Sequence, residues 1–226
     1  MRLGDRSIRM GVAAAGLIPL ASLIFDFAVD NLGTDPVETI TDRTGLWAFR
    51  MLLLALAVSP LRKALGAPGL LPHRRTFGLL AFLYAALHFA TYVLFDLDLH
   101  LAPLAEDLME RPFITVGFAT LLLLLALAIT STRGWIRRLG RRWQRLHRLV
   151  YVAVVLASVH FLWSAKADRL EPGLYAALAA GLLATRLVGA PGRKARKYAT
   201  LRRAQTPVGS TPDPQASEAG PEGSSP

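Results

Sequence analysis

Apolar residues of this chain gather into six runs, and the segments between the runs hold most of its charges. A helix that crosses the hydrocarbon core of a bilayer needs about 20 mostly apolar residues, with a lower limit of about 17. The run 121–128 has no polar face at helical spacing, as a buried helix of a soluble protein would have. The pattern predicts an all-α integral membrane protein, a bundle of six spanning helices over Ile8–Ala28, Leu46–Ser59, Thr76–Phe95, Pro112–Thr130, Leu149–Ala165 and Pro172–Val188.

Two of the six runs leave room for other interpretations. The run 46–59 is the shortest and contains Arg50, so it has the least support as a span, although residues 43–45 could lengthen it at the outer interface. The run 8–28 follows three arginines, as the apolar part of a signal peptide does. Because no persuasive small-residue cleavage site precedes Asp26, we expect a retained helix.

The chain divides into a membrane domain and a tail. Residues 1–190 are predicted to form the membrane domain, and residues 191–226 are first basic and then rich in Pro, Gly and Ser. Such a tail buries too little apolar surface to order itself, so we expect it to be disordered. A hydrophobic content of 53% and a mean hydropathy of +0.37 agree with a membrane protein.

Charge predicts the orientation of the bundle. The net charge is +10, and if the amino terminus is cytoplasmic, most of the 26 Lys and Arg residues fall on the cytoplasmic side, whereas most of the 16 acids fall outside. An excess of Lys and Arg in cytoplasmic loops is the main determinant of topology. Both termini are therefore predicted to be cytoplasmic, with anionic lipid as the partner of the basic clusters and no role in nucleic-acid binding.

The outer segment 96–111 alternates leucines with acids. This composition predicts a short amphipathic helix that lies in the membrane interface. The chain has no cysteine, which excludes disulfides, iron–sulfur ligation by thiolates and covalent attachment of c-type haem.

Three histidines lie within or beside the apolar runs. Ionisable side chains in membrane spans are costly and indicate functional sites, and a neutral imidazole is a good ligand of haem iron. In the predicted topology, His88 and His160 fall at similar depths toward the outer face, so we predict that they ligate one iron. The alternative for each is a core histidine that is hydrogen-bonded to a neighbouring helix.

His147 is predicted to lie near the cytoplasmic face, about 20 Å from His160 along a helix, where it would ligate a second iron. His73 is a candidate partner, but it follows Pro72 at the headgroup boundary, where a solvated histidine is the more usual finding. On an ideal helix His147 and His160 would point about 140° apart, so a common face requires a bulge or kink. The sequence therefore leaves open whether the chain binds one haem or two. His100 is expected on the surface.

Arginines surround the predicted inner site. Their guanidinium groups match the geometry of haem propionates or a flavin phosphate, and lipid phosphate fits equally well. They are Arg74, Arg75, Arg141, Arg142 and Arg145.

Short motifs spread in order from about residue 30 to 188 resemble the MsrQ (YedZ) family, the haem-binding membrane subunits of bacterial protein-methionine-sulfoxide reductase systems. They are Asp35-Pro-Val, Thr44-Gly, Ser59-Pro-Leu, Arg74-Arg75, Ala86-Leu-His88, Glu110-Arg-Pro112, Thr130-Ser-Thr132, the stretch from Arg141 to Tyr151, and the stretch from His160 to Lys166.

The resemblance implies a fold of the ferric-reductase-like transmembrane group, with b-type haem between the third and fifth helices. It implies that His88, His147 and His160 are axial ligands, and that Arg74 and Arg75 are a basic pair near the cytoplasmic face. The resemblance implies that electrons pass across the bacterial inner membrane from a cytoplasmic flavin reductase or the quinone pool to a periplasmic molybdopterin enzyme, MsrP. That enzyme repairs oxidised methionines in proteins. The carrier would be haem, either alone or together with FMN.

We therefore predict an electron-transfer subunit with no organic substrate site of its own. The alternatives are a self-contained ferric reductase or an NADPH-oxidase-like enzyme, which would need a nicotinamide domain larger than the forty or so residues after the last run. A small transporter should show helix-breaking residues in the middle of two corresponding spans, and Pro19 is the single candidate. A purely structural membrane anchor would be colourless.

Overall fold

The computed structural model describes residues 3–100, 102–165 and 169–188, and these residues form only helices and their connections. Five segments are long and apolar enough to cross a membrane: Ser7–Ala28, Pro36–Leu65, Pro68–Asp96, Pro112–Ile129 and Arg141–Ser164. The all-helical membrane bundle predicted from hydropathy is thus confirmed for the described part of the chain.

The helices follow the predicted runs with shifted ends. The long ones are α1 (Leu3–Ala28), α2 (Pro36–Leu65), α3 (His73–Thr91), α5 (Pro112–Ile129), α8 (Leu149–Ser164) and α9 (Leu170–Val188). The short ones are α4 (Ala102–Glu110), α6 (Arg133–Leu139) and α7 (Arg141–Leu146), with a 3-10 turn at Pro68–Leu70 and a π-helical turn at Tyr92–Asp96 that prolongs α3. The short helix expected between residues 96 and 111 is α4, whereas α9 is not among the five candidate spans.

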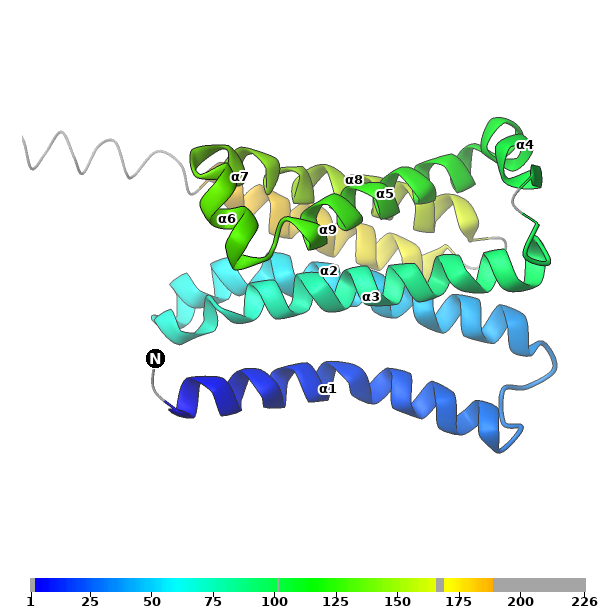
Figure 1. The fold of residues 1–226 in the computed structure, drawn as a ribbon, viewed down its shortest axis with the longest axis horizontal. Helices are drawn as coiled ribbons and strands as arrows, with labels where there is room; N and C mark the ends of the chain where they lie inside the picture. Colours follow the sequence, from blue (N-terminus) through cyan, green and yellow to red (C-terminus); the bar gives the residue numbers. More distant parts are fainter. Residues whose placement is uncertain (1–2, 101, 166–168, 189–226) are drawn as a thin grey trace, which may run out of the picture. The chain divides into compact units, whose positions relative to one another are not determined.

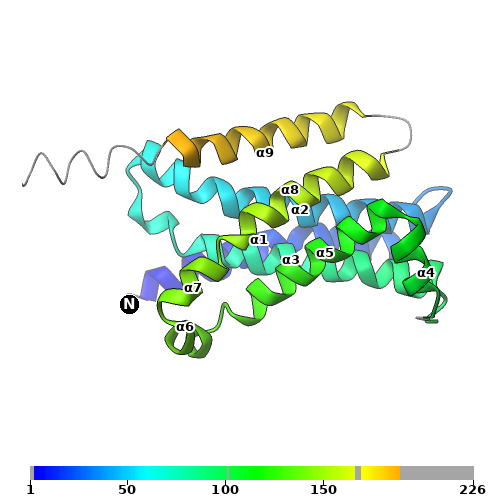
Figure 2. The ribbon, with the colours of Figure 1, turned by 90° about the horizontal axis from the view of Figure 1, so that it is seen from above.

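Two antiparallel helix pairs make up the centre of residues 1–185. The pair α2 and α3 and the pair α5 and α8 have the most extensive packing, and α3 joins them through α5 while its other side packs on α1 (Figure 1). In both views α4 lies at one end of the bundle, and α6 and α7 lie at the opposite end (Figures 1 and 2).

The prediction was wrong about which run has the least support as a membrane span. The run 46–59 belongs to α2, which at 30 residues is the longest helix of the described chain and has the largest buried share among the candidate spans. Its start is fixed by Asp35, whose carboxylate accepts the Glu38 N–H at 2.9 Å, and by Pro36 in the first turn. Its end is fixed by Gly66 in the left-handed region at φ 61°.

Arg50 is accommodated in α2 by partners on α9 and on α2 itself. Its Nε donates to the Tyr175 hydroxyl at 2.7 Å, its guanidinium lies 4.8 Å from the centre of the Trp47 ring, and Glu171 is 3.9 Å away. A cation that is hydrogen-bonded and stacked on an aromatic face costs less within a membrane than an isolated one. The charge that weakened the prediction of this span therefore connects α2 to α9.

The α1 helix is tied to the bundle at Pro19, which lies within it. The Tyr84 hydroxyl, on α3, donates to the Gly16 carbonyl at 2.8 Å and accepts the Leu20 N–H at 3.2 Å, and these are the two groups that an i to i−4 bond would join. A Cβ on Gly16 would meet the Leu80 side chain, so glycine permits this close approach. Tyr84 thus bridges the backbone of α1 next to its proline. Pro60 also lies inside a helix, but it is close to the end of α2 rather than in the middle of that span.

We expect Tyr84→Phe to lower the free energy of unfolding by about 1–2 kcal/mol, because two interhelical hydrogen bonds in an apolar environment are lost. Thermal or denaturant unfolding of the detergent-solubilised chain measures this. Tyr151→Phe is the matched control, since the structure gives that partly buried, described hydroxyl no hydrogen bond. Equal stability of the two variants would contradict a role for the Tyr84 bridge.

Candidate haem site

His88 and His160 lie next to each other although they come from different helix pairs. Their ring centres are 6.1 Å apart and their planes make an angle of 77°. His88 is near the end of α3 and His160 is near the end of α8, both toward the end of the bundle where α4 lies. The two histidines that the sequence placed at equal depth are therefore brought together by the fold.

Each of the two imidazoles is held by a backbone carbonyl. His88 Nδ1 is 2.9 Å from the Thr41 carbonyl on α2, and His160 Nδ1 is 2.8 Å from the Phe113 carbonyl on α5. A carbonyl oxygen only accepts hydrogen bonds, so both Nδ1 atoms must carry the proton. The lone pair of each neutral ring is then on Nε2, which is the tautomer that a metal ion requires.

A glycine beside each imidazole makes this contact possible. A Cβ on Gly45 would lie 3.0 Å from His88 Nδ1, and a Cβ on Gly117 would lie 2.7 Å from His160 Cε1. Each glycine stands four residues after the residue whose carbonyl is used, and in an α-helix that carbonyl points toward the turn that holds the glycine. The absence of a side chain there lets the ring reach the carbonyl.

The two halves of the site repeat each other. The spacing from carbonyl to histidine is 47 residues in both, from Thr41 to His88 and from Phe113 to His160. With a glycine four residues after the carbonyl in each half, the pair α2 and α3 and the pair α5 and α8 build equivalent supports.

The ring separation fits one metal ion between the two imidazoles. Two rings on opposite sides of one ion have centres about 6.3 Å apart, because each metal–nitrogen bond is about 2 Å and each nitrogen is about 1.1 Å from its ring centre. The observed 6.1 Å matches this value. Two imidazole ligands fit haem, whose macrocycle supplies the remaining ligands of the iron.

His147 has a different environment. It lies in the break between α7 and α8. The helix is thus interrupted at His147, as the angle of about 140° between His147 and His160 on an ideal helix would require for a common face. The Thr130 hydroxyl oxygen lies 2.7 Å from the Ala126 carbonyl and 3.2 Å from His147 Nε2, so Nε2 is hydrogen-bonded to Thr130. The hydrogen bond to Thr130 occupies Nε2. The imidazole ring also stacks on Trp143, with ring centres 4.0 Å apart.

His73 and the two arginines begin helix α3. His73 is 8% exposed and its Nδ1 has no hydrogen-bond partner within the described chain, so it is not the solvated histidine that its position suggested. Arg74 is near enough to His147 for their charges to interact, whereas Arg75 is exposed. His100 is exposed, as predicted. The structure records no contact between the His73 and His147 rings, both of which it describes.

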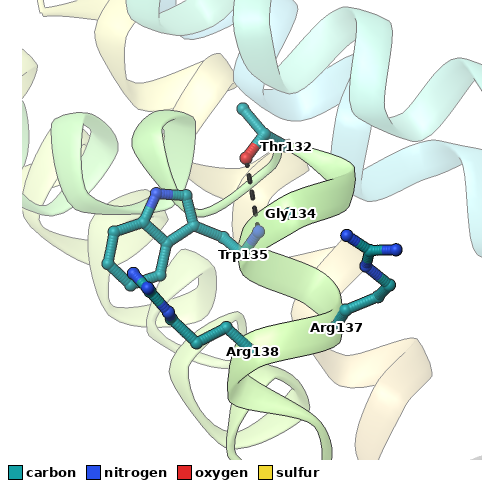
Figure 3. A pocket seen from close by; sticks show the side chains of 5 residues that line it. All are labelled: Thr132, Gly134, Trp135, Arg137 and Arg138. Atoms are coloured by element: carbon teal, nitrogen blue, oxygen red, sulfur yellow. Dashed lines mark hydrogen bonds between the residues drawn. The ribbon is translucent and has the colours of Figure 1, made fainter.

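A shallow basic pocket lies on α6, at the end of the bundle opposite α4 (Figure 3). Thr132, Gly134, Trp135, Arg137 and Arg138 line it, the Arg138 guanidinium lies 5.4 Å from the Trp135 ring centre, and Thr132 Oγ1 accepts the Trp135 N–H at 3.4 Å. The pocket presents positive charge on the side where the topology prediction puts the cytoplasm.

Sequence reasoning missed the supports of the two histidines. Gly45 and Gly117 and the carbonyls of Thr41 and Phe113 carry no chemical signature of their own. A glycine in each of the two spans that precede a histidine-bearing span was the available signal.

Comparison with known proteins places the chain among haem-binding membrane subunits. Residues 44–158 match the family model of the ferric reductase like transmembrane component. A protein of Xanthomonas axonopodis pv. citri, the protein-methionine-sulfoxide reductase heme-binding subunit MsrQ, is 46% identical over 89% of this chain and 93% of its own length. Proteins of the same name from Xanthomonas campestris pv. campestris and Brucella ovis are 48% and 46% identical, over 79% and 84% of this chain and 85% and 86% of their own lengths.

We expect Gly117→Ala to reduce the haem that the purified protein retains, because the new methyl group would lie 2.7 Å from His160 Cε1 and displace the ring. Haem quantitation against protein concentration measures this. Gly78→Ala on α3 is the control, since a Cβ there meets nothing within 4 Å and gains the same helix propensity. Full haem retention in Gly117→Ala would contradict the importance of this close approach.

Proposed function

Because this chain belongs to the MsrQ family, within the ferric-reductase-like transmembrane group, we propose that it carries electrons across the bacterial inner membrane to a protein-methionine-sulfoxide reductase. The observation that carries the proposal is the pair of adjacent imidazoles, His88 and His160, each with Nδ1 bound to a carbonyl, which leaves the lone pair on Nε2. Haem, when bound, supplies a one-electron iron couple.

His88 and His160 would hold a b-type haem between α3 and α8 through their Nε2 atoms. The lack of cysteine in the sequence fits a haem held without thioether bonds. The Thr41 and Phe113 carbonyls fix the orientation of the two rings and make each Nε2 a stronger donor to iron.

The inner site of the chain lacks the symmetry of the outer one. His88 precedes His160 by 72 residues. The residue that precedes His147 by the same number is Arg75, not His73, and Arg75 and His73 lie on different faces of α3. A second haem on His147 would need Nε2 to leave Thr130 and would have no histidine at the equivalent position. Arg74 and Arg75 are then available for a haem propionate or for the phosphate of FMN.

Six spans give both termini a cytoplasmic position. The sixth is α9, whose 19 residues suffice to cross the hydrocarbon core and which Tyr175 connects to Arg50 of α2. In this orientation α6, α7 and their arginines face the cytoplasm and α4 faces the periplasm.

Electrons enter at the cytoplasmic end and leave at the outer end. The basic surface of α6 and α7 suits an acidic face of a flavin reductase, and the quinone pool is the alternative donor. The acceptor is a periplasmic molybdopterin reductase of the MsrP type, as the names of the relatives imply a reductase subunit. The acidic outer loops are its docking surface, and we expect no organic substrate site on this subunit.

Replacing His88 or His160 by Ala should abolish the low-spin haem spectrum, because each removes one of two axial ligands. Absorption spectroscopy with haem quantitation on the purified chain tests this. His100→Ala is the control and should keep the spectrum of the unmodified chain. Retention of the low-spin spectrum in His88→Ala or His160→Ala would refute the proposed ligation.

Replacing His147 by Ala should preserve the low-spin haem held by His88 and His160, because His147 is bonded to Thr130 and stacked on Trp143 rather than placed at that pair. The same spectra, with the haem-to-protein ratio, distinguish loss of a second haem from loss of both. Complete loss of haem from a stably folded His147→Ala would contradict the assignment of the outer pair.

A further inference from the structure

Met109 is the most exposed of the large apolar side chains in the described residues, with 80% of its surface accessible. It lies on α4, the short helix at the end of the bundle where His88 and His160 are found (Figure 1). Of the other methionines that the structure describes, Met51 is 3% exposed inside α2, and Met10 is exposed on α1. Among these three, Met109 alone lies between the spans on the outer side in the proposed topology.

Contacts on one face of α4 fix the direction of Met109. The Tyr92 hydroxyl donates to the Asp107 carboxylate, Arg111 pairs with Asp107 at 3.3 Å, and the Thr115 hydroxyl donates to the Leu108 carbonyl at 2.5 Å. Leu104, Asp107 and Leu108 are partly buried, and at 100° per residue they form one face of the helix. Met109 is on the opposite face.

The neighbours of Met109 show that this opposite face is hydrated. Glu106, three residues earlier, shares the exposed face, and Glu110 adjoins it; both carboxylates are exposed. Charged side chains keep their ionised groups in water, so this face points away from the lipid. The thioether of Met109 is thus held in the aqueous phase, where dissolved oxidants reach it.

We infer that Met109 is a site of reversible oxidation, and that its sulfoxide is a substrate of the reductase to which this chain delivers electrons. The inference rests on the proposed function and adds a substrate: the subunit itself. An exposed methionine is oxidised to the sulfoxide, and enzymes that reduce methionine sulfoxide restore it.

The chemistry balances with a peroxide or a hypohalous acid as the oxidant. The sulfur of Met109 takes one oxygen from hydrogen peroxide, the O–O bond breaks, and water leaves, so that the sulfur loses two electrons. The reductase returns two electrons with two protons, the sulfur–oxygen bond breaks, and the products are the thioether and water. The electrons are those that the proposed function already supplies.

The first test measures oxidation alone. The full-length, haem-loaded chain in lipid nanodiscs is treated with limiting hydrogen peroxide, and the sulfoxide at each methionine is followed by peptide mass spectrometry. We expect Met109 to be oxidised at least about tenfold faster than Met51, since exposure governs the reaction. Similar rates at Met109 and Met51 would overturn the inference whether or not the chain carries electrons.

The second test measures repair. The oxidised chain is incubated with the purified reductase partner, and electrons are supplied to that partner directly by a reduced viologen, which bypasses the haem. We expect the Met109 sulfoxide to return to the thioether, whereas a persistent sulfoxide beside complete reduction of an oxidised control peptide would overturn the inference. Met109→Leu serves as the matched control in which the oxidised peptide is absent.

A third arm separates the inference from the proposed function. Electrons are then supplied only through this chain, from a flavin reductase with NADH. Repair of Met109 with the viologen, but no reduction of either Met109 or the control peptide through the chain, would support the inference on Met109 and refute electron transfer by the chain. Repair by both routes would support both.

Discussion

An imidazole in an apolar bundle needs a partner for each ring nitrogen, and this requirement organises the centre of the molecule. In His88 and His160, a carbonyl of the neighbouring helix accepts the Nδ1 proton, which leaves the lone pair of each neutral ring on Nε2. The carbonyls belong to α2 and α5, so the positions of these two helices set the orientation of the imidazoles on α3 and α8. A shift of either helix would change the tautomer or the direction of a ring.

The close approach of helices explains why small residues recur at these points. Gly45 and Gly117 let an imidazole reach a backbone that a methyl group would shield, and Gly16 does the same for Leu80 and Tyr84 at α1. Association of helices in a membrane relies on such tight packing and on interhelical hydrogen bonds, because lipid offers no hydrophobic driving force between spans. Arg50 follows the same rule, since its hydrogen bond to Tyr175 connects α9 to α2.

The two ends of the bundle differ in chemistry. At one end, α6 and α7 present arginines and the Trp135 pocket, and at the other, α4 presents glutamates and Met109. An asymmetric distribution of charge orients the chain in the membrane and also distinguishes the partners that can dock on each side. His147 lies near the basic end with its Nε2 bound to Thr130, so the repeat that builds the outer site does not extend to the inner one.

The helical membrane fold, the position of most spans and the three histidines within or beside them follow from the sequence alone, because hydropathy and the cost of burying imidazole are local properties of the chain. It underestimated α2, since the partners that stabilise Arg50 come from Trp47 on its own helix and from the distant α9. The sequence predicted the pair of His88 and His160, but helix packing was needed to show that His73 is buried apart from His147 and that Thr41, Phe113, Gly45 and Gly117 support the pair. The contacts of Thr41 with His88 and of Phe113 with His160 join residues 47 positions apart, where the chain's local periodicity carries no information and helix packing alone sets the distance.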